Sequence, residues 1–486
     1  MGSINWRAIC YINGFLLFAL AFIMLIPPLF DVWFFKQDQT HGFYIGFCLC
    51  FVVGSSLILA NRSNEKMVLE QREAFLITTF VWIILSLFSS IPLYVNIPEI
   101  SFVDACFESV SSLTTTGATI LKKIEQLPMS ILLWRSILQW LGGIGIIVIA
   151  MSFFPALRLG GMQLFRSEFS DRYEKILPKI SQIAASLLIC YIFFTFICGV
   201  LYYSFGMSFF DALCHAMGTI STGGASNYSD SVLHFNSFTL ELICCFFMII
   251  GGTTLMLFIR MFYDDWRIIK REEQFFLYLK MLLFFSIIVV FWFFFCEKLT
   301  FLNALRTGIF NVISCLTTSG YTNTSFTWTP FPFAIFFFLS CIGGCTGSTT
   351  GGIKIFRLQV LMTFAATHMR QLRRPNSVLV PKFQGHKITD AVAFSVFTLI
   401  TLYILMIVVL TVLLSACGLD FFAAIASAGS VLGNVGTGLG SLADRGVGIT
   451  PLSYMMSKYI LMLGMICGRL ELLTFLILFM PSFWKD

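Results

Sequence analysis

Charged residues are scarce in this chain, since only 12% of its 486 residues are Asp, Glu, Lys or Arg. A soluble globular domain carries about 25% charged residues. In their place the chain has 58% hydrophobic residues, including 56 phenylalanines. This composition excludes an ordinary soluble protein, and most of the chain is expected to lie in lipid.

The motifs of common catalytic sites are also missing. The sequence contains no HExxH, no nucleophile elbow and no phosphate-binding Walker loop. Its 15 cysteines are scattered through apolar segments without metal-like spacing, which favours small buried side chains over a metal site or a disulfide framework. No apolar segment carries an arginine at every third position, so a voltage sensor is excluded. We therefore expect no enzyme activity and no cofactor bound by this chain.

Long apolar segments dominate the sequence. A spanning helix needs about 20 mainly apolar residues. Ten segments fit this description, at 8–30, 42–60, 74–96, 130–154, 181–204, 237–262, 276–297, 331–370 (interrupted), 388–416 and 451–483. The first segment is too long for a signal peptide and lacks a small-residue cleavage site. The expected fold is an all-α polytopic membrane protein with about ten transmembrane helices.

Basic residues gather in three of the connecting regions. These regions are 155–180 (Arg158, Arg166, Arg172, Lys175, Lys179), 260–280 (Arg260, Arg267, Lys270, Arg271, Lys280) and 354–387 (Lys354, Arg357, Arg370, Arg373, Arg374, Lys382, Lys387). The positive-inside rule places them in the cytoplasm, and we expect both termini there too. Charge that flanks lipid explains these clusters fully, so nucleic-acid binding is not needed to account for them.

From about residue 71 one pattern occurs four times: a long helix, a short amphipathic segment, a polar hairpin centred on glycine, and a second long helix. The hairpins, called filter loops below, are Leu113–Thr119, Ile220–Ala225, Leu316–Thr322 and Leu432–Gly438. Their expected central glycines, Gly117, Gly223, Gly320 and Gly436, stand 106, 97 and 116 residues apart. Such a period indicates internal repeats. We expect repeats at 71–160, 161–272, 273–372 and 373–486, after a two-helix region at 1–70.

Four such loops suit a cation filter. A dehydrated cation needs other oxygens, which rings of backbone carbonyls supply, and glycine tolerates the backbone conformations required. Each short segment would form a half-membrane helix whose C-terminal dipole, roughly half a charge, points at the ion. An acidic or amide residue near each start suits an N-cap. These residues are Asp104, Asp211, Asn303 and Asp420.

The second helices carry glycines at similar places, Gly142-Gly143, Gly251-Gly252, Gly343-Gly344 and Gly464, which allow close helix packing. In the third repeat the helix is interrupted by a polar stretch. Non-helical backbone at membrane depth must be buried in protein or line a cavity. We interpret this stretch as a gate, with a packing kink as the alternative. Its residues are Gly344, Cys345, Thr346, Gly347, Ser348, Thr349, Thr350, Gly351 and Gly352.

Two basic residues lie at membrane depth, where a charge costs about 2.5–3.5 kcal/mol and usually marks function. Arg469 would face the pore and raise the barrier to a cation, or form a salt bridge with Glu471 or a neighbouring helix. Lys354 would join the gate or extend toward the cytoplasm. Near the outer mouth, Asp104, Glu108 and Asp211 attract cations or cap helices, and His215 is expected to be a packing residue.

Taken together, the four loops, the broken third-repeat helix with its GSTTGG stretch, and Gly468-Arg469-Leu470-Glu471 resemble the Trk/Ktr/HKT superfamily of potassium transporters. The two extra N-terminal helices look most like the TrkH branch of bacteria. The resemblance covers about residues 7 to 480. It implies a four-fold pseudo-symmetric pore subunit, normally a homodimer of two separate pores. It also implies a cytoplasmic TrkA-like ring that binds nucleotides and controls the gate.

The resemblance also assigns residues. Its ion-coordinating positions fall on Thr115, Thr116, Gly117, Ser221, Thr222, Gly223, Thr318, Ser319, Gly320, Asn434, Val435 and Gly436. Its gating loop falls on 344–352 and its pore arginine on Arg469. Relatives that prefer sodium replace the first-repeat glycine by serine, so the four glycines here favour potassium, with looser selectivity than a filter of four identical loops.

Three functions are compared. We expect potassium uptake across the bacterial inner membrane through a gated pore. Symport coupled to H⁺ or Na⁺ stays open, because nothing in the sequence tests it. An alternating-access carrier would show inverted repeats, whereas these repeats share one orientation. An intramembrane enzyme would need paired catalytic groups that are missing here.

Overall fold

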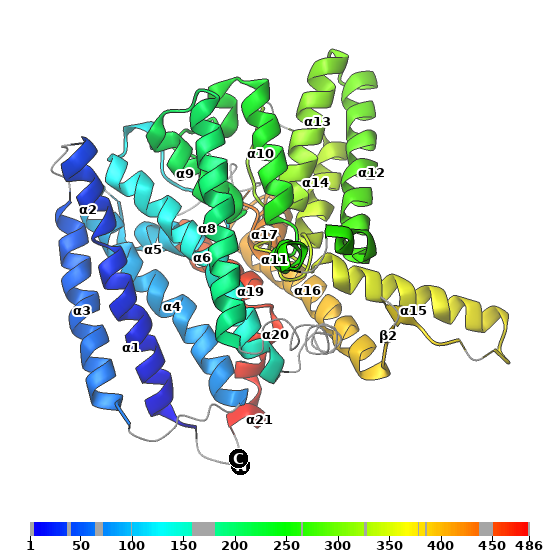
Figure 1. The fold of residues 1–486 in the computed structure, drawn as a ribbon, viewed down its shortest axis with the longest axis horizontal. Helices are drawn as coiled ribbons and strands as arrows, with labels where there is room; N and C mark the ends of the chain where they lie inside the picture. Colours follow the sequence, from blue (N-terminus) through cyan, green and yellow to red (C-terminus); the bar gives the residue numbers. More distant parts are fainter. Residues whose placement is uncertain are drawn as a thin grey trace.

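The structure is a computed structural model that describes residues 4–35, 40–63, 71–98, 100–157, 180–263, 266–324, 328–377, 379–383, 386–436 and 451–484. Side chains of 146–157 are not among those described. The predicted basic residues of 158–179 and the loop residues Thr437 and Gly438 lie outside these ranges. Helices make up nearly all of the described chain (Figure 1).

The N-terminal region forms a helical hairpin, and each repeat then starts with a long helix. The hairpin consists of α1 (Trp6–Ile23), α2 (Ile26–Phe30), the π-helical turn η1 (Asp31–Phe35) and α3 (His41–Asn61). The first helices of the four repeats are α4 (Gln71–Asn96), α8 (Ile180–Ser204), α12 (Glu273–Phe295) and α16 (Asp390–Ala416).

Each repeat continues with a half-helix and a second helix. The half-helices are α5 (Phe102–Leu113), α9 (Phe209–Ile220), α13 (Phe301–Leu316) and α17 (Phe421–Gly433). The second helices are α6 (Met129–Leu157), α10 (Phe238–Gly251) with α11 (Leu255–Tyr263), α14 (Pro330–Ile342) with α15 (Ile355–Arg373), and α19 (Pro451–Arg469) with α20 (Leu473–Leu476). Short helical turns lie at Ile124–Gln126 (η2), Ser231–Phe235 (η3), Trp266–Arg271 (η4), Ile477–Phe479 (η5) and Pro481–Trp484 (α21).

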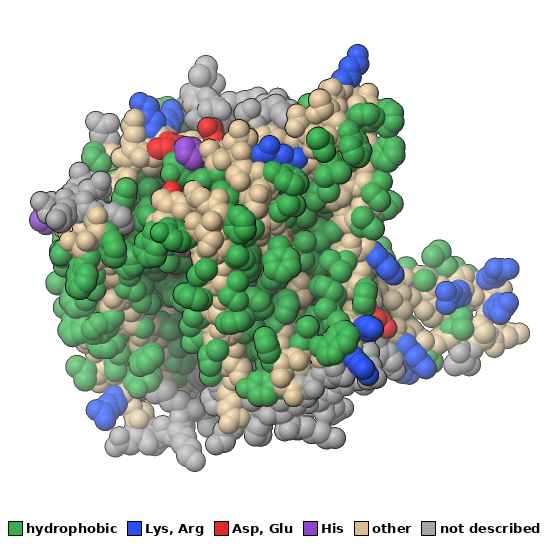
Figure 2. Space-filling model, turned by 45° about the horizontal axis from the view of Figure 1, so that its top comes forward, with side chains coloured by type: hydrophobic (Ala, Val, Ile, Leu, Met, Phe, Trp, Pro, Cys, Tyr) green, Lys and Arg blue, Asp and Glu red, His purple; other side chains and the backbone are tan. Residues whose placement is uncertain are grey.

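Six described helices are long and apolar enough to cross a membrane, or eight if each strongly bent pair is one span. Their side chains form a broad apolar belt, and charged residues gather along the upper edge and at the lower right (Figure 2). Large aromatic side chains such as Phe196 and Phe291 are exposed on this belt, where lipid would cover them. The helical membrane fold is therefore confirmed, and the count of ten spans stays a prediction.

Three of the four second helices are interrupted. The predicted break in the third repeat separates α14 from α15. In the second repeat, α10 and α11 meet at 84° across Gly252, where the sequence predicted one continuous segment. In the fourth, α19 bends by 110° into the next helical segment just beyond Arg469. The residues at these bends turn out to be the floor of the candidate site.

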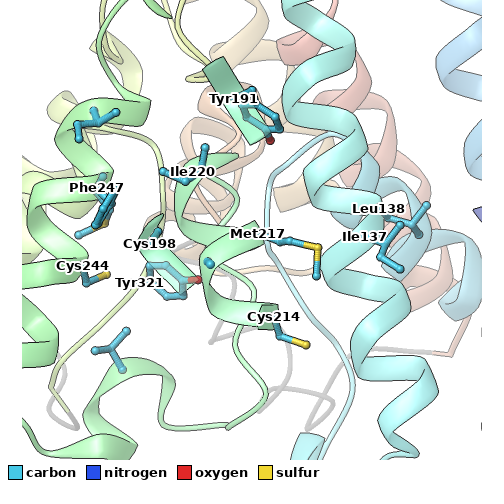
Figure 3. Close-up of a cluster of buried hydrophobic side chains, with 14 of the residues drawn as sticks. Ile137, Leu138, Tyr191, Cys198, Cys214, Met217, Ile220, Cys244, Phe247 and Tyr321 are labelled. Atoms are coloured by element: carbon cyan, nitrogen blue, oxygen red, sulfur yellow. The ribbon is translucent and has the colours of Figure 1, made fainter. Parts of the chain in front are cut away.

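Neighbouring repeats pack through shared hydrophobic clusters: the first three repeats share one, and the fourth packs with the first in another. Figure 3 shows Met217 of α9 pointing toward α6, which carries Ile137, while Ile220 lies on the other side of α9 in the same cluster. Tyr321, from the loop after α13, reaches the same cluster, and its hydroxyl lies 3.3 Å from the carbonyl oxygen of Ala225. All fifteen cysteines are described and each is a free thiol.

One element projects from the body of the molecule. Helix α15 extends outward at the lower right of Figure 1, and a two-residue hairpin, β1 (Lys382–Phe383) paired antiparallel with β2 (His386–Lys387), follows it. Phe383 packs on Phe356 and ties this hairpin to the first turn of α15. The hairpin is the only departure from an all-helical chain among the described residues.

Candidate ion filter and gate

The four half-helices begin at hydroxyl or acidic N-caps and end where the filter loops begin. The N-caps are Ser101, Ser208, Thr300 and Asp420. The prediction that Asp104, Asp211 and Asn303 cap these helices was therefore wrong. Asp104 and Asp211 lie three residues later, and each carboxylate accepts a hydrogen bond from the hydroxyl of the N-cap serine at 2.7 Å. The same hydroxyl accepts a hydrogen bond from the aspartate's backbone amide, at 3.2 Å in α5 and 3.1 Å in α9, and this reciprocal pair fixes the starts of these two helices.

The filter loops share one backbone conformation. A non-glycine residue with left-handed φ opens each loop: Thr115 (55°), Thr222 (52°), Thr318 (53°) and Asn434 (54°). Two residues later comes a glycine with positive φ: Gly117 (72°), Gly224 (68°), Gly320 (79°) and Gly436 (74°). The residue between them is called the middle residue here: Thr116, Gly223, Ser319 or Val435. The amide of this middle residue bonds in each loop to the equivalent carbonyl of its half-helix, as with Thr116 to Ser111 at 2.9 Å and Gly223 to Gly218 at 2.9 Å.

This geometry corrects the register of the second loop. Gly224, and not Gly223, is the equivalent of Gly117, so the residues expected from sequence in this loop are one position early. Thr222 and Gly223 remain within the equivalent triplet. Ser221 instead matches Thr114 and Thr317, which precede the triplets in the first and third loops. The sequence could not show which of the two adjacent glycines is equivalent to Gly117, because only their φ angles distinguish them.

Backbone contacts join the four loops in the order third, second, first and fourth. A Cβ placed on Gly117 would overlap the carbonyl oxygen of Gly223 in the second loop. One on Gly224 would overlap the carbonyl of Ser319 in the third, and one on Gly436 would overlap the carbonyl of Thr116 in the first. In each of these contacts a middle carbonyl lies against the glycine of an adjacent repeat. Backbone from all four quarters of the chain is therefore brought together, with no room for a side chain at Gly117, Gly224 or Gly436.

Hydroxyl groups tie the loops internally. The hydroxyls of Thr114 and Thr116 are 2.8 Å apart, and those of Thr317 and Ser319 are 2.9 Å apart in the equivalent places. In the fourth loop the Asn434 amide donates to the Thr116 hydroxyl at 3.0 Å, which joins repeats four and one. These side chains are buried, so they hold the loops rather than line a wide opening.

Buried carboxylates hold the chain just beyond three of the loops. Glu108 accepts hydrogen bonds from the Thr119 hydroxyl and the Ile120 amide, both at 2.7 Å. Asp211 accepts one from Asn227 at 2.9 Å. Glu241 accepts one from Asn323 at 3.0 Å. These acids therefore support the segments that follow the loops.

His215 belongs to the same group of supporting residues. Its ring nitrogens lie 2.8 Å from the Asp211 carbonyl oxygen and 3.1 Å from the Ser226 hydroxyl. The side chain is buried, as expected for a packing residue.

Glycines of the second helices lie directly beneath the loops. A Cβ on Gly142 would overlap the carbonyl of Leu113, the last residue of its own half-helix, and one on Gly468 would overlap that of Leu432. The fourth-repeat equivalent is thus Gly468, whereas the predicted Gly464 packs on the side chain of Val431. Such contacts set the second helices against the negative C-terminal ends of the half-helices.

The predicted gate lies across the floor of the filter. The Cys345 amide donates to the Gly252 carbonyl at 2.9 Å, and the Gly351 amide donates to the Thr318 hydroxyl at 3.0 Å. A Cβ on Gly351 would overlap the Gly433 carbonyl. The loop therefore contacts the second, third and fourth repeats at once.

Inside the loop, hydroxyls satisfy the backbone. The Thr350 hydroxyl accepts from the Gly344 amide at 3.2 Å and lies 2.7 Å from the Ser348 hydroxyl. Gly347 and Gly352 adopt positive φ angles of 77° and 75°. Thr346 contributes its carbonyl oxygen to the Thr254 hydroxyl at 2.6 Å. The stretch is thus a folded loop with its own hydrogen bonds.

Arg469 connects this loop to the first repeat. Its guanidinium donates to the carbonyl of Thr349 at 2.8 Å and to that of Gly142 at 2.7 Å, and the side chain is fully buried. The alternative of a salt bridge to Glu471 is not what the structure contains, because Glu471 pairs with Arg357 at 2.5 Å. The guanidinium of a fourth-repeat arginine therefore bridges the first and third repeats below the loops.

Lys354 follows the loop and is buried, with only 7% of its surface exposed. Its φ of 73° is a strained value for a lysine, and its amide donates to the Ile342 carbonyl at 2.7 Å. Its ammonium group lies within electrostatic range of Glu471, Arg357 and Arg469. It is therefore part of a charged cluster under the gate instead of extending to solvent.

Comparison with known proteins agrees with this architecture. The profile of the family described as "TrkH: Cation transport protein" matches residues 39–485. The chain belongs to the TrkH family. The chain is 35% identical to the Trk system potassium uptake protein TrkI of Halomonas elongata, over 99% of this chain and 98% of that protein. It is 34% identical to the Trk system potassium uptake protein TrkH of Salmonella typhimurium, over 99% and 100%.

The fold matches a solved member of the TrkH family as well. The crystal structure of the potassium transporter TrkH from Vibrio parahaemolyticus superposes with a TM-score of 0.90 at 31% identity, covering 99% of this chain and 100% of that one. The resemblance drawn from the sequence is confirmed. As a TrkH-family member the chain is a membrane cation transport protein and not an enzyme.

Proposed function

We propose that this chain is the pore-forming subunit of a potassium uptake system in the bacterial inner membrane. The ring of four filter loops carries this proposal. Its carbonyls lie just beyond the C-terminal ends of four half-helices, whose dipoles favour a cation and disfavour an anion. The relatives named above are potassium uptake proteins, which makes K⁺ the expected ion.

The ion-binding residues proposed here are the loop triplets 115–117, 222–224, 318–320 and 434–436. Glycine in each triplet permits the left-handed backbone and the close approach of the next loop. Potassium is written as the transported ion, and the chain needs no resident cofactor for this function. The repeats at 71–160, 161–272, 273–372 and 373–486 are the proposed units of the pore.

The loop 344–352 is the proposed gate and Arg469 its latch. A permeating cation must pass the floor where the Arg469 guanidinium joins Thr349 to Gly142. Because like charges repel strongly at low dielectric, a buried arginine on that path raises the barrier. Opening would require these two hydrogen bonds to break and the loop to move aside. Lys354 next to the loop would add to the same barrier.

The finer points of assembly are also proposals. Both termini would be cytoplasmic, on the side of the basic residues of α15 and the hairpin. The pore would pair with a second copy of itself. A TrkA-like nucleotide-binding subunit would contact the cytoplasmic face and control the loop. Membrane lipid would cover the apolar belt.

The decisive measurement is the reversal potential of the purified chain in planar bilayers with opposed K⁺ and Na⁺ gradients. A potential that follows the K⁺ gradient supports a channel-like pore, since uptake could then use the membrane potential, worth about 2.3 kcal/mol per charge per 100 mV. A potential that shifts with an imposed Na⁺ or H⁺ gradient would favour symport. Saturable organic-solute flux without K⁺ current would favour the alternating-access carrier.

A further inference from the structure

The second filter loop lacks a side chain that the other three have. Its middle residue is Gly223, whereas the equivalent positions hold Thr116, Ser319 and Val435. In the first and third loops this side chain carries a hydroxyl that is tied to the threonine two residues earlier, at 2.8 Å and 2.9 Å. The second loop has no such tie, and yet it adopts the same backbone conformation.

Gln139 of the first repeat fills the missing place. A Cβ on Gly223 would lie 2.7 Å from both Cδ and Oε1 of Gln139 and 3.1 Å from its Nε2. The Gln139 amide thus occupies the space that a side chain at position 223 would take. Its side chain is fully buried, so the amide group is removed from water and must find partners within the protein.

Both ends of that amide bond to the loop. Nε2 donates to the carbonyl oxygen of Gly223 at 2.8 Å, and Oε1 accepts from the backbone amide of Ala225 at 3.0 Å. The two bonds bracket Gly224, the glycine of this loop. The Gly223 carbonyl is also the one that lies against Gly117 of the first loop. Gln139 therefore holds the junction between two adjacent loops of the ring.

The other repeats do not use this device. Gln139 precedes Gly142 by three residues, and Gly142 lies beneath Leu113. The matching positions before Gly251 and Gly468 are Met248 and Met465, both buried. Among the described residues, none of the other middle carbonyls receives a side-chain donor of this kind. The glutamine therefore occurs in the first repeat, which lies against the second loop, and this is the loop with glycine as its middle residue.

We propose that Gln139 is a positioning residue that determines ion selectivity. It holds the Gly223 carbonyl and the Gly224 backbone in place of the internal hydroxyl tie found in the first and third loops. Without it, the doubly glycine loop can adopt other backbone conformations and fit a smaller ion, because glycine is the least restricted residue. This inference rests on the proposed function of the ring as a potassium filter.

The first test is Gln139→Met, which installs the residue found at the matching positions of two other repeats. Both hydrogen bonds of the amide are then lost, and we expect the K⁺ over Na⁺ permeability ratio from bi-ionic reversal potentials to fall at least about fivefold, the effect of one typical hydrogen bond. Gln371→Met, the same change on the projecting helix α15, is the matched control and should leave the ratio unchanged. Gel filtration checks that each variant is folded.

The second test replaces the hydrogen bonds of Gln139 by a hydroxyl–hydroxyl bond like those inside the first and third loops. Gly223→Ser alone should damage the loop, because its Cβ meets the Gln139 amide. Gln139→Ala with Gly223→Ser frees that space and returns a hydroxyl to the middle position. Its partner would be Ser221, which lies two residues before position 223, as Thr317 lies two residues before Ser319. The hydroxyls of Ser221 and Thr317 already donate to equivalent half-helix carbonyls, those of Gly218 at 3.2 Å and Ser314 at 3.3 Å. The double variant should recover selectivity that Gln139→Ala alone loses, a non-additive result that mere destabilisation would not produce.

The outcomes separate the two claims. A wild-type ratio near one would refute the proposed potassium filter. A selective wild type with an unchanged Gln139→Met ratio would refute only the role of Gln139. The role would also be refuted if the double variant were no more selective than Gln139→Ala.

Discussion

At the residue scale, the register of the second loop makes a direct prediction. Gly224→Ala should abolish selective K⁺ current, because its φ of 68° disfavours a side chain and the new Cβ would overlap the Ser319 carbonyl. The measurement is the permeability ratio in bilayers. Gly206→Ala is the matched control, since Gly206 also has a positive φ of 111° but nothing within 4 Å of its Cβ position.

The control separates strain from collision. Both substitutions incur the backbone cost of about 1–2 kcal/mol for a left-handed residue, so both should lower stability slightly. Only Gly224→Ala should change the filter. Equal effects of the two variants on permeability would argue against the ring geometry.

A second residue-scale prediction concerns Glu108 and Arg135, which are 3.4 Å apart and almost fully buried. Glu108→Ala should lower stability by about 3–5 kcal/mol, because it leaves a buried arginine without its carboxylate. It also removes the acceptor for Thr119 and Ile120. Thermal unfolding of the purified protein would measure the loss.

The more exposed pair Arg260–Glu272, at 3.9 Å, is its control. Glu272→Ala should cost less than about 1 kcal/mol. If Glu108→Ala unfolded no earlier than Glu272→Ala, the support assigned to Glu108 would be wrong.

At the scale of the element, we predict that the loop 344–352 keeps the pore closed, so that weakening the loop shifts the equilibrium toward the open state. The Thr349 hydroxyl lies within hydrogen-bonding distance of the carbonyls of Ile220 (3.2 Å) and Gly251 (3.1 Å) and can donate its proton to either one. Thr349→Val removes these bonds at nearly constant shape, and deletion of 346–351 removes the loop. Both should raise open probability in single-channel recordings, the deletion more strongly, with the K⁺ over Na⁺ ratio preserved.

Thr367→Val on α15 is the control, because that hydroxyl donates to the carbonyl of Thr363, one turn earlier in its own helix. It should leave gating unchanged. Unaltered open probability in the deletion variant would mean that the stretch is only a packing kink.

The elements show how far sequence reasoning extends. The half-helices and the broken third-repeat helix could be predicted because short amphipathic segments and glycine clusters have a local signature. The break between α10 and α11 was missed because Gly251-Gly252 was interpreted as a packing surface alone. Gly252, Thr253 and Thr254 follow α10 directly, and that run of glycine and threonine is the signal that could have shown the bend.

The candidate site was also predictable in its position along the chain but not in its detailed contacts. Loop positions followed from the repeat, but the choice between Gly223 and Gly224 depends on φ angles that two adjacent glycines do not encode. Gln139 left no signal either, since a single glutamine in an apolar helix acquires its partner 84 positions away only in the folded chain. Pairings of this kind are tertiary, and periodicity does not report them.

At the scale of the whole molecule, the orientation in the membrane is testable through exposed lysines at opposite ends. The first group follows the first filter loop (Lys122, Lys123) and the C-terminal end of α12 (Lys298). The second group lies in the basic regions and consists of Lys270, Lys382 and Lys387. A membrane-impermeant amine reagent should label the first group in right-side-out spheroplasts and the second in inside-out vesicles, as read by mass spectrometry. Heat-disrupted membranes, in which both groups should react, provide the reference. The reverse pattern would place the filter loops at the cytoplasmic face, where a gate beneath them could not be reached by a cytoplasmic regulatory subunit.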